Sequence, residues 1–302
     1  MGKLFWAMAL TLLVLGILLS TVFWIVMWFL KVTGTTVILF TFLFVGGMIF
    51  LQWWIGPGLI KLFTRMRECT DQKIIDIVHR TADESKIPRP KVYVVENPTP
   101  NAFAFGRTQK SSCVALHTGL LEKLSEEEVR GVIAHEIGHI KHRDVLVMTL
   151  ASALPVILFY VIYFGTIFAS SKNERGGGFN YLGAWLGAMV AQFLATLLVL
   201  YLSRVREYHA DAYSAYLTKK PSALANALAK ITYDLGRTGA ARPVPTNTNL
   251  RTFYIADPQM AVSEYQAEMQ KEKGKKFIEI FLTHPLTFKR IAALKKIEKE
   301  IS

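Results

Sequence analysis

The sequence predicts a mostly α-helical membrane protein, in which four transmembrane helices carry a cytoplasmic domain that contains a small β-sheet. Three observations lead to this fold class. Of the 302 residues, 52% are hydrophobic and the mean hydropathy is +0.30, which is more apolar than is usual for a soluble chain. The apolar residues gather in four long runs. Positively charged residues gather beside those runs.

The four apolar runs are residues 4–30, 35–56, 145–170 and 181–202, and the first two contain no charged residue. Each reaches the ~20 residues that an α-helix needs to cross ~30 Å of hydrocarbon at 1.5 Å per residue. The first run is far longer than the ~7–15 apolar residues of a signal peptide, and a second run follows at once. We therefore expect four retained transmembrane helices.

The positive charge beside these runs indicates their orientation. Lysine and arginine follow the second and fourth runs and precede the third, at Lys61, Arg65, Arg67, Lys141, Arg143, Arg204 and Arg206. By the positive-inside rule, both termini and both large polar segments lie in the cytoplasm. The rule also accounts for the net charge of +12 without a nucleic-acid partner. The sequence thus predicts a multi-pass protein of the cell (inner or plasma) membrane.

Two polar segments, 57–143 and 203–302, remain outside the runs, and we expect them to pack together as one domain. In the first segment, an apolar periodicity predicts a helix over 69–87. Alternating β-branched and aromatic residues predict strands over 91–97, 101–106 and 111–120. A capping box then marks the start of another helix, with Ser125 as N-cap and Glu128 three residues later.

The second polar segment begins as an extension of the fourth run and continues with a helix over about 222–237. Residues 238–262 are rich in turn formers and predict a long irregular region, which we interpret as a candidate lid. The basic run 271–276 is interpreted as a solvated loop, with a membrane-surface contact as the alternative. An amphipathic helix over 288–301 ends the chain.

The two cysteines, Cys69 and Cys113, both fall in segments predicted to be cytoplasmic. In a reducing compartment a disulfide between them is not expected. Their spacing fits no zinc-binding pattern, so we interpret them as ordinary thiols.

The stretch VIAHEIGHIKHRD, residues 132–144, carries the chemistry of this sequence. His135 and His139 are four residues apart, so on an α-helix both imidazoles lie on one face and can bind one metal ion. Zinc is commonly bound by imidazole nitrogen at ~2.0–2.1 Å. Glu136 lies beside the pair, where it can act as a base on water. The spacing predicts a metal site with an adjacent base at the foot of a transmembrane helix.

A third ligand is expected from the stretch REYHAD, residues 206–211, in which Glu207 and Asp211 share one face of a second helix. A catalytic zinc site needs three protein ligands and one open position, and Glu207 would complete a set of two histidines and one glutamate. Asp211 would accept the second N–H of a ligand histidine and orient it. The alternative is a solvated helix face paired with Arg204 and Arg206.

These residues resemble a known family. The motifs HEIGH and EYHAD, separated by two apolar runs, are similar to those of the HtpX-type membrane zinc endopeptidases, a gluzincin family that also includes the CAAX prenyl proteases. The segments NAFAFG (101–106) and THPLTFKRIAAL (283–294) also resemble family segments. Leu286 departs from the pattern, because the family usually has a second proline there. The likeness covers essentially the whole chain.

The resemblance implies a gluzincin-like metalloprotease domain that holds one zinc ion, with His135, His139 and Glu207 as ligands and Glu136 as general base. It further implies that Asn101, Ala102, Phe103 and Ala104 form an edge strand that lines the substrate cleft. Such a strand would bind an extended peptide by strand addition. The alternative is a plain hairpin strand.

A tetrahedral oxyanion needs a positive partner besides zinc, and the candidates are His284 and Arg290 in the C-terminal matching segment. The alternative is a histidine that caps a turn and a surface arginine. His142 and His209 are interpreted as residues outside the metal site. His79 and His117 are interpreted as structural.

The predicted function is zinc-dependent cleavage of peptide bonds at a membrane. By resemblance, the substrates are unfolded or damaged membrane proteins and the role is quality control. A CAAX-type processing protease is one alternative, disfavoured because that type has seven spans. A non-catalytic membrane scaffold with a structural zinc site is another, although such sites use four protein ligands. A metal-ion transporter is a third alternative. It would need ionisable residues inside the spans, and the first, second and fourth spans contain none between their ends. The oligomeric state stays open.

Overall fold

The computed structural model describes residues 35–170, 179–241 and 278–301. By their contacts, the residues divide into a unit that ends at Phe50 and a unit that runs from Leu51 to Ser302. The boundary falls within helix α2 (Thr35–Thr64). Most of the described residues are helical, and the strands form one small mixed sheet. The predicted fold class is confirmed to this extent.

The sheet has four strands in the order β1-β2-β4-β3. Its members are β1 (Arg67–Glu68), β2 (Lys91–Val95), β3 (Ala102–Phe105) and β4 (Cys113–His117). The pair β2–β4 is parallel and the other two pairs are antiparallel, which leaves β3 at one edge. The two-residue strand β1 has too short a pattern to be predicted.

The third predicted strand, 111–120, is shorter in the structure. The 3-10 turn η1 (Gln109–Ser111) precedes β4, and helix α4 (Thr118–Lys123) follows it directly. A helix can begin at Thr118 because the Thr118 hydroxyl and the Gly119 N–H both form hydrogen bonds with the main chain of Asn97. Such long-range contacts are not visible in a local apolar pattern.

Side chains alternate between the two faces of the sheet, as a strand requires. On one face Tyr93, Phe103 and Phe105 form a separate aromatic cluster, against which Ile60 and Met66 pack. On the other face Ala102, Val114, Leu116 and their neighbours join the main core, which includes the buried residues of helix α5 (Glu126–Lys141). The edge strand β3 is thereby held against α5.

Helix α5 is the centre of the domain and packs against α3 (Gln72–Glu84), α7 (Phe179–Thr218), α8 (Pro221–Ala241) and strand β3. The predicted capping box is confirmed, because the Ser125 hydroxyl accepts from the Glu128 N–H and the Glu128 carboxylate accepts from the Ser125 N–H. This cap satisfies donors that a helix N-terminus otherwise leaves open.

Two glycines let the other helices approach α5 closely. A Cβ at Gly131 would lie 3.1 Å from the backbone nitrogen of Leu224 in α8, and one at Gly138 would lie 3.2 Å from the ring of Tyr213 in α7. Gly138 also lies between the two histidines His135 and His139 in sequence. In the structure it makes room for α7, which carries Glu207.

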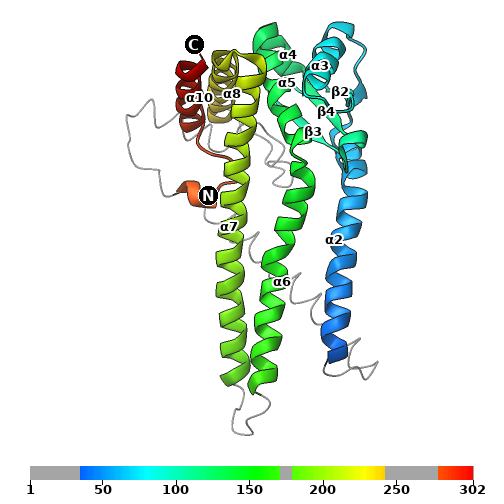
Figure 1. Ribbon diagram of the computed structural model, residues 1–302, viewed down its shortest axis with the longest axis vertical. Helices are drawn as coiled ribbons and strands as arrows, with labels where there is room; N and C mark the ends of the chain where they lie inside the picture. The colour runs from blue at the N-terminus through cyan, green and yellow to red at the C-terminus, as the bar shows by residue number, and fades with distance from the viewer. Residues whose placement is uncertain (1–34, 171–178, 242–277, 302) are drawn as a thin grey trace. The chain divides into compact units, whose positions relative to one another are not determined.

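Helices α6 (Asp144–Ser170) and α7 run side by side (Figure 1). Within the described residues, two helices are long and apolar enough to cross a membrane: Asp144–Thr166 and Tyr181–Thr218. The first overlaps the predicted span 145–170. The second contains the predicted span 181–202 and continues beyond it. The predicted span 35–56 is helical as part of α2, and the predicted span 4–30 lies outside the described residues. Four transmembrane helices therefore stay a prediction.

Helix α7 continues without a break from its apolar part into the segment that carries Glu207, whereas α5 and α6 are separate helices joined at His142 and Arg143. Arg143 adopts a positive φ of 56° at this turn. The predicted helix 222–237 is part of α8, and the predicted C-terminal helix is α10 (Thr287–Ile301), which packs against α8 and α7. The candidate lid 238–262 lies outside the described residues after residue 241, as does the run 271–276.

Candidate metal centre

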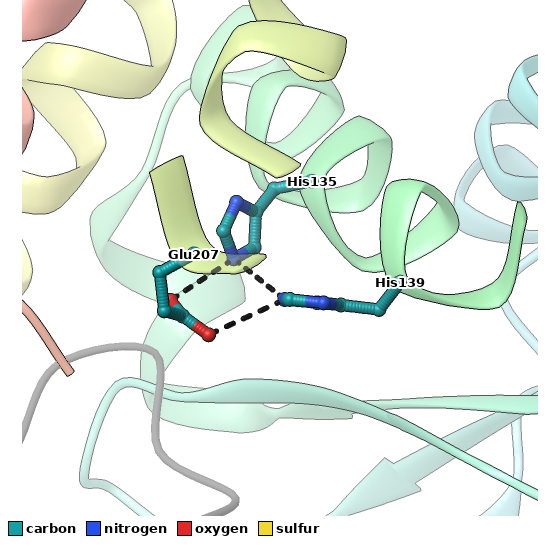
Figure 2. Close-up of side chains that lie close together, drawn as sticks. All are labelled: His135, His139 and Glu207. Carbon is teal, nitrogen blue, oxygen red and sulfur yellow. Dashed lines mark hydrogen bonds and ion pairs between the residues drawn. The ribbon is translucent and has the colours of Figure 1, made fainter. Parts of the chain in front are cut away.

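Three side chains from two helices converge on one point. His135 and His139 extend from α5, and Glu207 extends from α7 toward both imidazoles (Figure 2). The Nε2 atoms of the two histidines are 3.1 Å apart. The Glu207 carboxylate oxygens lie 3.6 Å from Nε2 of His135 and 3.5 Å from Nε2 of His139. The spacing of four residues on α5 and the close approach of α7 together bring this set of donors into one place.

The donor set fits a metal ion. Zinc binds imidazole nitrogen and carboxylate oxygen at ~2.0–2.2 Å with tetrahedral geometry, which places neighbouring donor atoms ~3.3 Å apart. The three separations above lie close to this value. Among the described residues, this is the group of three or more histidine, cysteine or acidic side chains that is arranged to hold an ion.

The charge around the donors also fits a cation. The carboxylates of Glu136, Glu207 and Asp211 are all buried, and the guanidinium of Arg290 is buried among them. With neutral imidazoles, three negative charges and one positive charge leave −2, which a divalent cation would balance. Buried charge of one sign is costly without such compensation.

The surroundings of His135 also favour a positive charge. Its Nδ1 lies 3.0 Å from Oδ1 of Asp211. Burial alone would lower the pKa of His135, but the hydrogen bonds to Asp211 and Glu207 raise it to about 9. Asp211 thus contacts the imidazole of His135, and its role in orienting a metal ligand stays a prediction.

Arg290 joins the two carboxylates of α7. Its Nε and Nη2 donate to Asp211 at 2.8 and 2.7 Å, and its Nη1 lies 3.1 Å from Oε2 of Glu207. Only 1% of Arg290 is exposed, so it is not the surface arginine of the alternative interpretation. The charge-assisted, two-pronged contact with Asp211 is a strong and directional one. The geometry fits a residue that holds Asp211 and Glu207 in place.

His284 lies on the other side of Glu207. Its Nε2 is 3.6 Å from Oε1 of Glu207, and its Nδ1 is 3.0 Å from the hydroxyl of Thr283. The side chain is buried. The structure therefore brings both C-terminal candidates, His284 and Arg290, to the cluster across a sequence separation of more than 70 residues.

His139 has a partner that the sequence analysis missed. The carboxylate of Asp144, at the first position of α6, lies 2.7 Å from Nδ1 of His139. The same carboxylate forms an ion pair with Arg206 of α7, which also donates to the carbonyl of His142. The available signal was the position of Asp144, directly after the histidine motif and at the start of an apolar run.

The carboxylate of Glu136 faces the edge strand β3. Its Oε2 accepts from the backbone N–H of Ala104 at 2.7 Å. Burial raises the pKa of this carboxyl group. A buried carboxylate with a raised pKa beside a cation site has the properties of a general base.

The predicted edge strand occupies the expected place. Asn101 and Ala102 are buried, Phe103 belongs to the aromatic cluster on the far face of the sheet, and Ala104 is the residue that contacts Glu136. The carbonyl of Asn101 accepts from the N–H of His117, which ties this end of β3 to β4.

The remaining histidines lie outside the donor set. His142 and His209 stack edge to face with ring centroids 4.3 Å apart, and Nδ1 of His142 contacts the carbonyl of Gly138. His117 contacts the carbonyl of Thr99, and burial lowers its pKa. Both cysteines are buried and free.

Comparison with known proteins gives consistent results. Residues 68–298 match the model of the family described as Peptidase family M48. A relative named Protease HtpX homolog 2, from Methanosarcina acetivorans, is 34% identical over 291 residues, which cover 94% of this chain and 93% of the relative. A relative named Protease HtpX homolog, from Methanothermobacter thermautotrophicus, is 40% identical over 200 residues, which cover 65% of this chain and 74% of the relative.

Among solved structures, that of S. mikatae Ste24p matches with a TM-score of 0.57 and 19% sequence identity. The match covers 92% of this chain but only 62% of the Ste24p chain, so this protein spans less than two thirds of that length. At this identity the likeness shows a shared fold.

Proposed function

This chain belongs to peptidase family M48 and is therefore a metalloprotease, and we propose that it is a membrane-integrated zinc endopeptidase that degrades unfolded or damaged membrane proteins. The observation that carries the proposal is the convergence of His135, His139 and Glu207 (Figure 2). The buried carboxylate of Glu136 interacts electrostatically with all three of them. Two imidazoles and one carboxylate are a donor set of catalytic zinc sites, which keep one position open.

His135, His139 and Glu207 would hold the zinc ion. When bound, zinc supplies a Lewis acid that lowers the pKa of water toward ~7 and polarises a peptide carbonyl. Glu136 would accept the proton of the attacking water at its carboxylate and deliver it to the departing amine. Glu136 is buried and interacts electrostatically with His135, His139 and Glu207, so its carboxylate is placed to act on a water molecule at the site.

His284 would stabilise the oxyanion of the tetrahedral intermediate, since its Nε2 lies beside Glu207. Arg290 is better suited to a positioning role. Its three donor nitrogens are used on Asp211 and Glu207, and donors that are already engaged are not available to a developing charge.

The peptide substrate would add to the edge of β3, which lies against the site through the contact between Ala104 and Glu136. Apart from the Ala104 N–H and the Asn101 carbonyl, which already contact Glu136 and His117, the main chain of Asn101–Ala104 would supply the hydrogen bonds to the peptide. Main-chain hydrogen bonds depend little on substrate sequence, which suits degradation of many different unfolded chains.

The two apolar helices support insertion of the protein into a membrane. Asp144 contacts His139 from the first position of α6, and Glu207 lies on α7 just beyond the apolar part. Glu207 at the foot of one span, and the partner of His139 at the foot of the other, would hold the zinc close to the bilayer surface. The positive charges beside the spans support a cytoplasmic location of the site and of both termini.

The test uses purified protein in detergent and one membrane protein in a folded and a destabilised form. We expect preferential cleavage of the destabilised form, loss of cleavage after chelation, and recovery when zinc is returned. Cleavage that survives complete metal removal would contradict the proposal. Exclusive cleavage of a prenylated C-terminal peptide would favour the processing alternative, and zinc binding without any cleavage would favour a scaffold.

Asp144→Asn is expected to weaken metal binding, because Asp144 orients His139 through Nδ1. Partners of metal-bound histidines typically contribute about 10–100-fold in metal affinity. The measurement is the zinc dissociation constant, determined by competition with a coloured chelator. The matched control is Asp83→Asn, which removes a surface ion pair with Arg89. A variant with reduced thermal stability but unchanged zinc affinity would show that Asp144 has a structural role only.

A further inference from the structure

A cavity of about 350 Å³ opens beside the candidate metal centre, and the mechanism proposed above does not use it. Its walls come from three places: the end of β3 with the loop after it, the end of α5, and the first turn of α6. The residues that define these walls are Ala104, Gly106, Gln109, His139, Ile140 and Leu146.

The cavity is continuous with the site. Ala104 lines it and also donates its backbone N–H to Glu136. His139 lines it and is one of the three converging donors. A peptide that lies along β3 beside Glu136 would therefore pass the mouth of the cavity. Successive side chains of an extended peptide point to opposite faces, so one side chain near the cleaved bond would enter it.

The walls favour an apolar occupant. Ile140, Val145 and Leu146 contribute aliphatic surface, and Val145 and Leu146 are 41% and 37% exposed, so this surface is accessible. Burial of a large apolar side chain against such a wall is favourable because it removes apolar surface from water. Small-molecule sites begin at ~300 Å³, so the volume accommodates the largest side chains, including those of Phe and Trp.

The charges of the lining disfavour a lysine or arginine side chain in the cavity. Arg107, Lys110 and Arg143 contribute three positive charges. The carboxylate in the lining is that of Asp144, and it already contacts His139 and Arg206. A basic side chain would meet like charge without a counter-charge to pair with, which is costly at a specificity site.

We propose that this cavity is the pocket that sets cleavage preference, and that it takes one large apolar side chain, aromatic or long aliphatic, of a peptide bound along β3. The inference rests on the proposed peptidase function and names the substrate class for it. A pocket of this kind selects segments that are buried in folded proteins and become exposed when those proteins unfold.

The test replaces a residue of the pocket lining by a larger one, so that its side chain occupies the pocket. Leu146→Trp adds bulk to the lining at the foot of α6, and Val145→Trp does so from the neighbouring position. Wild type and variants are incubated with a chemically unfolded protein of known sequence, and the cleavage sites are identified by mass spectrometry. Two peptides that differ only by Phe or Ala at the preferred position then give kcat/KM values.

The wild type is expected to show large apolar residues enriched at one fixed position relative to the cleaved bond. In at least one filled variant this enrichment should disappear, with kcat/KM for the Phe peptide reduced about tenfold or more and that for the Ala peptide retained, since single groups in apolar pockets give effects of this size. Leu150→Trp is the matched control, because Leu150 lies one helical turn beyond Leu146, is exposed, and is not in the lining.

An unchanged cleavage profile in both filled variants, with bound zinc and thermal stability equal to wild type, would overturn the pocket while the peptidase function stands. The same loss of preference in Leu150→Trp would overturn it as well. A wild type that binds zinc but cleaves neither the unfolded protein nor the peptides would refute the proposed function and this inference with it.

Discussion

Glu136→Gln is expected to reduce peptide hydrolysis by at least about 10²–10⁴-fold, the contribution of a positioned general base. The amide keeps the size of the side chain but cannot take a proton from water at neutral pH. The three converging donors are unchanged, so zinc content should equal that of wild type. The measurement is the rate of cleavage of an unfolded protein together with metal analysis of the same sample.

Glu127→Gln is the matched control for this variant. It makes the same chemical change on the same helix, at an exposed position that pairs with Lys220 rather than with the site. Its activity should equal that of wild type. Activity of Glu136→Gln within a factor of a few of wild type would rule out Glu136 as the base, or would reveal a contaminating protease.

Glu207→Gln is expected to abolish activity by a different route, through loss of the metal. The charged carboxylate is the donor from α7, and its oxygens face both imidazoles (Figure 2). Removing a direct ligand should weaken zinc binding by more than the about 10–100-fold that an orienting partner contributes. The substitution also removes one of the two carboxylates that Arg290 contacts.

Zinc affinity and cleavage rate, measured on the same preparation, distinguish the two variants. Glu136→Gln should hold zinc without cleaving, whereas Glu207→Gln should lose both properties, and excess zinc should restore part of the activity of the second variant only. Full zinc occupancy of Glu207→Gln at wild-type affinity would show that the metal is held by other residues.

Much of the site could be predicted from the sequence because it depends on helix periodicity. His135 and His139 are four residues apart on one helix, and Glu207 and Asp211 are four residues apart on another, so each pair shares a face wherever the helices pack. The start of α5 was also predictable, since the reciprocal cap between Ser125 and Glu128 is a contact across three residues. The resemblance then connected the two helices to one metal site.

Other features were not predictable in this way. The lack of a Cβ at Gly138 is required by the close approach of Tyr213 from α7. The strand predicted over 111–120 ends at His117, because hydrogen bonds to Asn97 favour a helix from Thr118. In both cases the deciding neighbour is distant in sequence, so no local pattern records it.

Patterns within single elements were enough to predict the apolar helices, the capped helix and the four side chains that carry the proposed chemistry, because each pattern depends on spacing within one element. Three other features came to light in the folded chain: Asp144 contacts His139, Arg290 contacts Asp211 and Glu207, and a cavity opens beside Ala104. These contacts join separate elements, whose relative positions are set by the packing of the whole core. Residue spacing within one element does not contain that information.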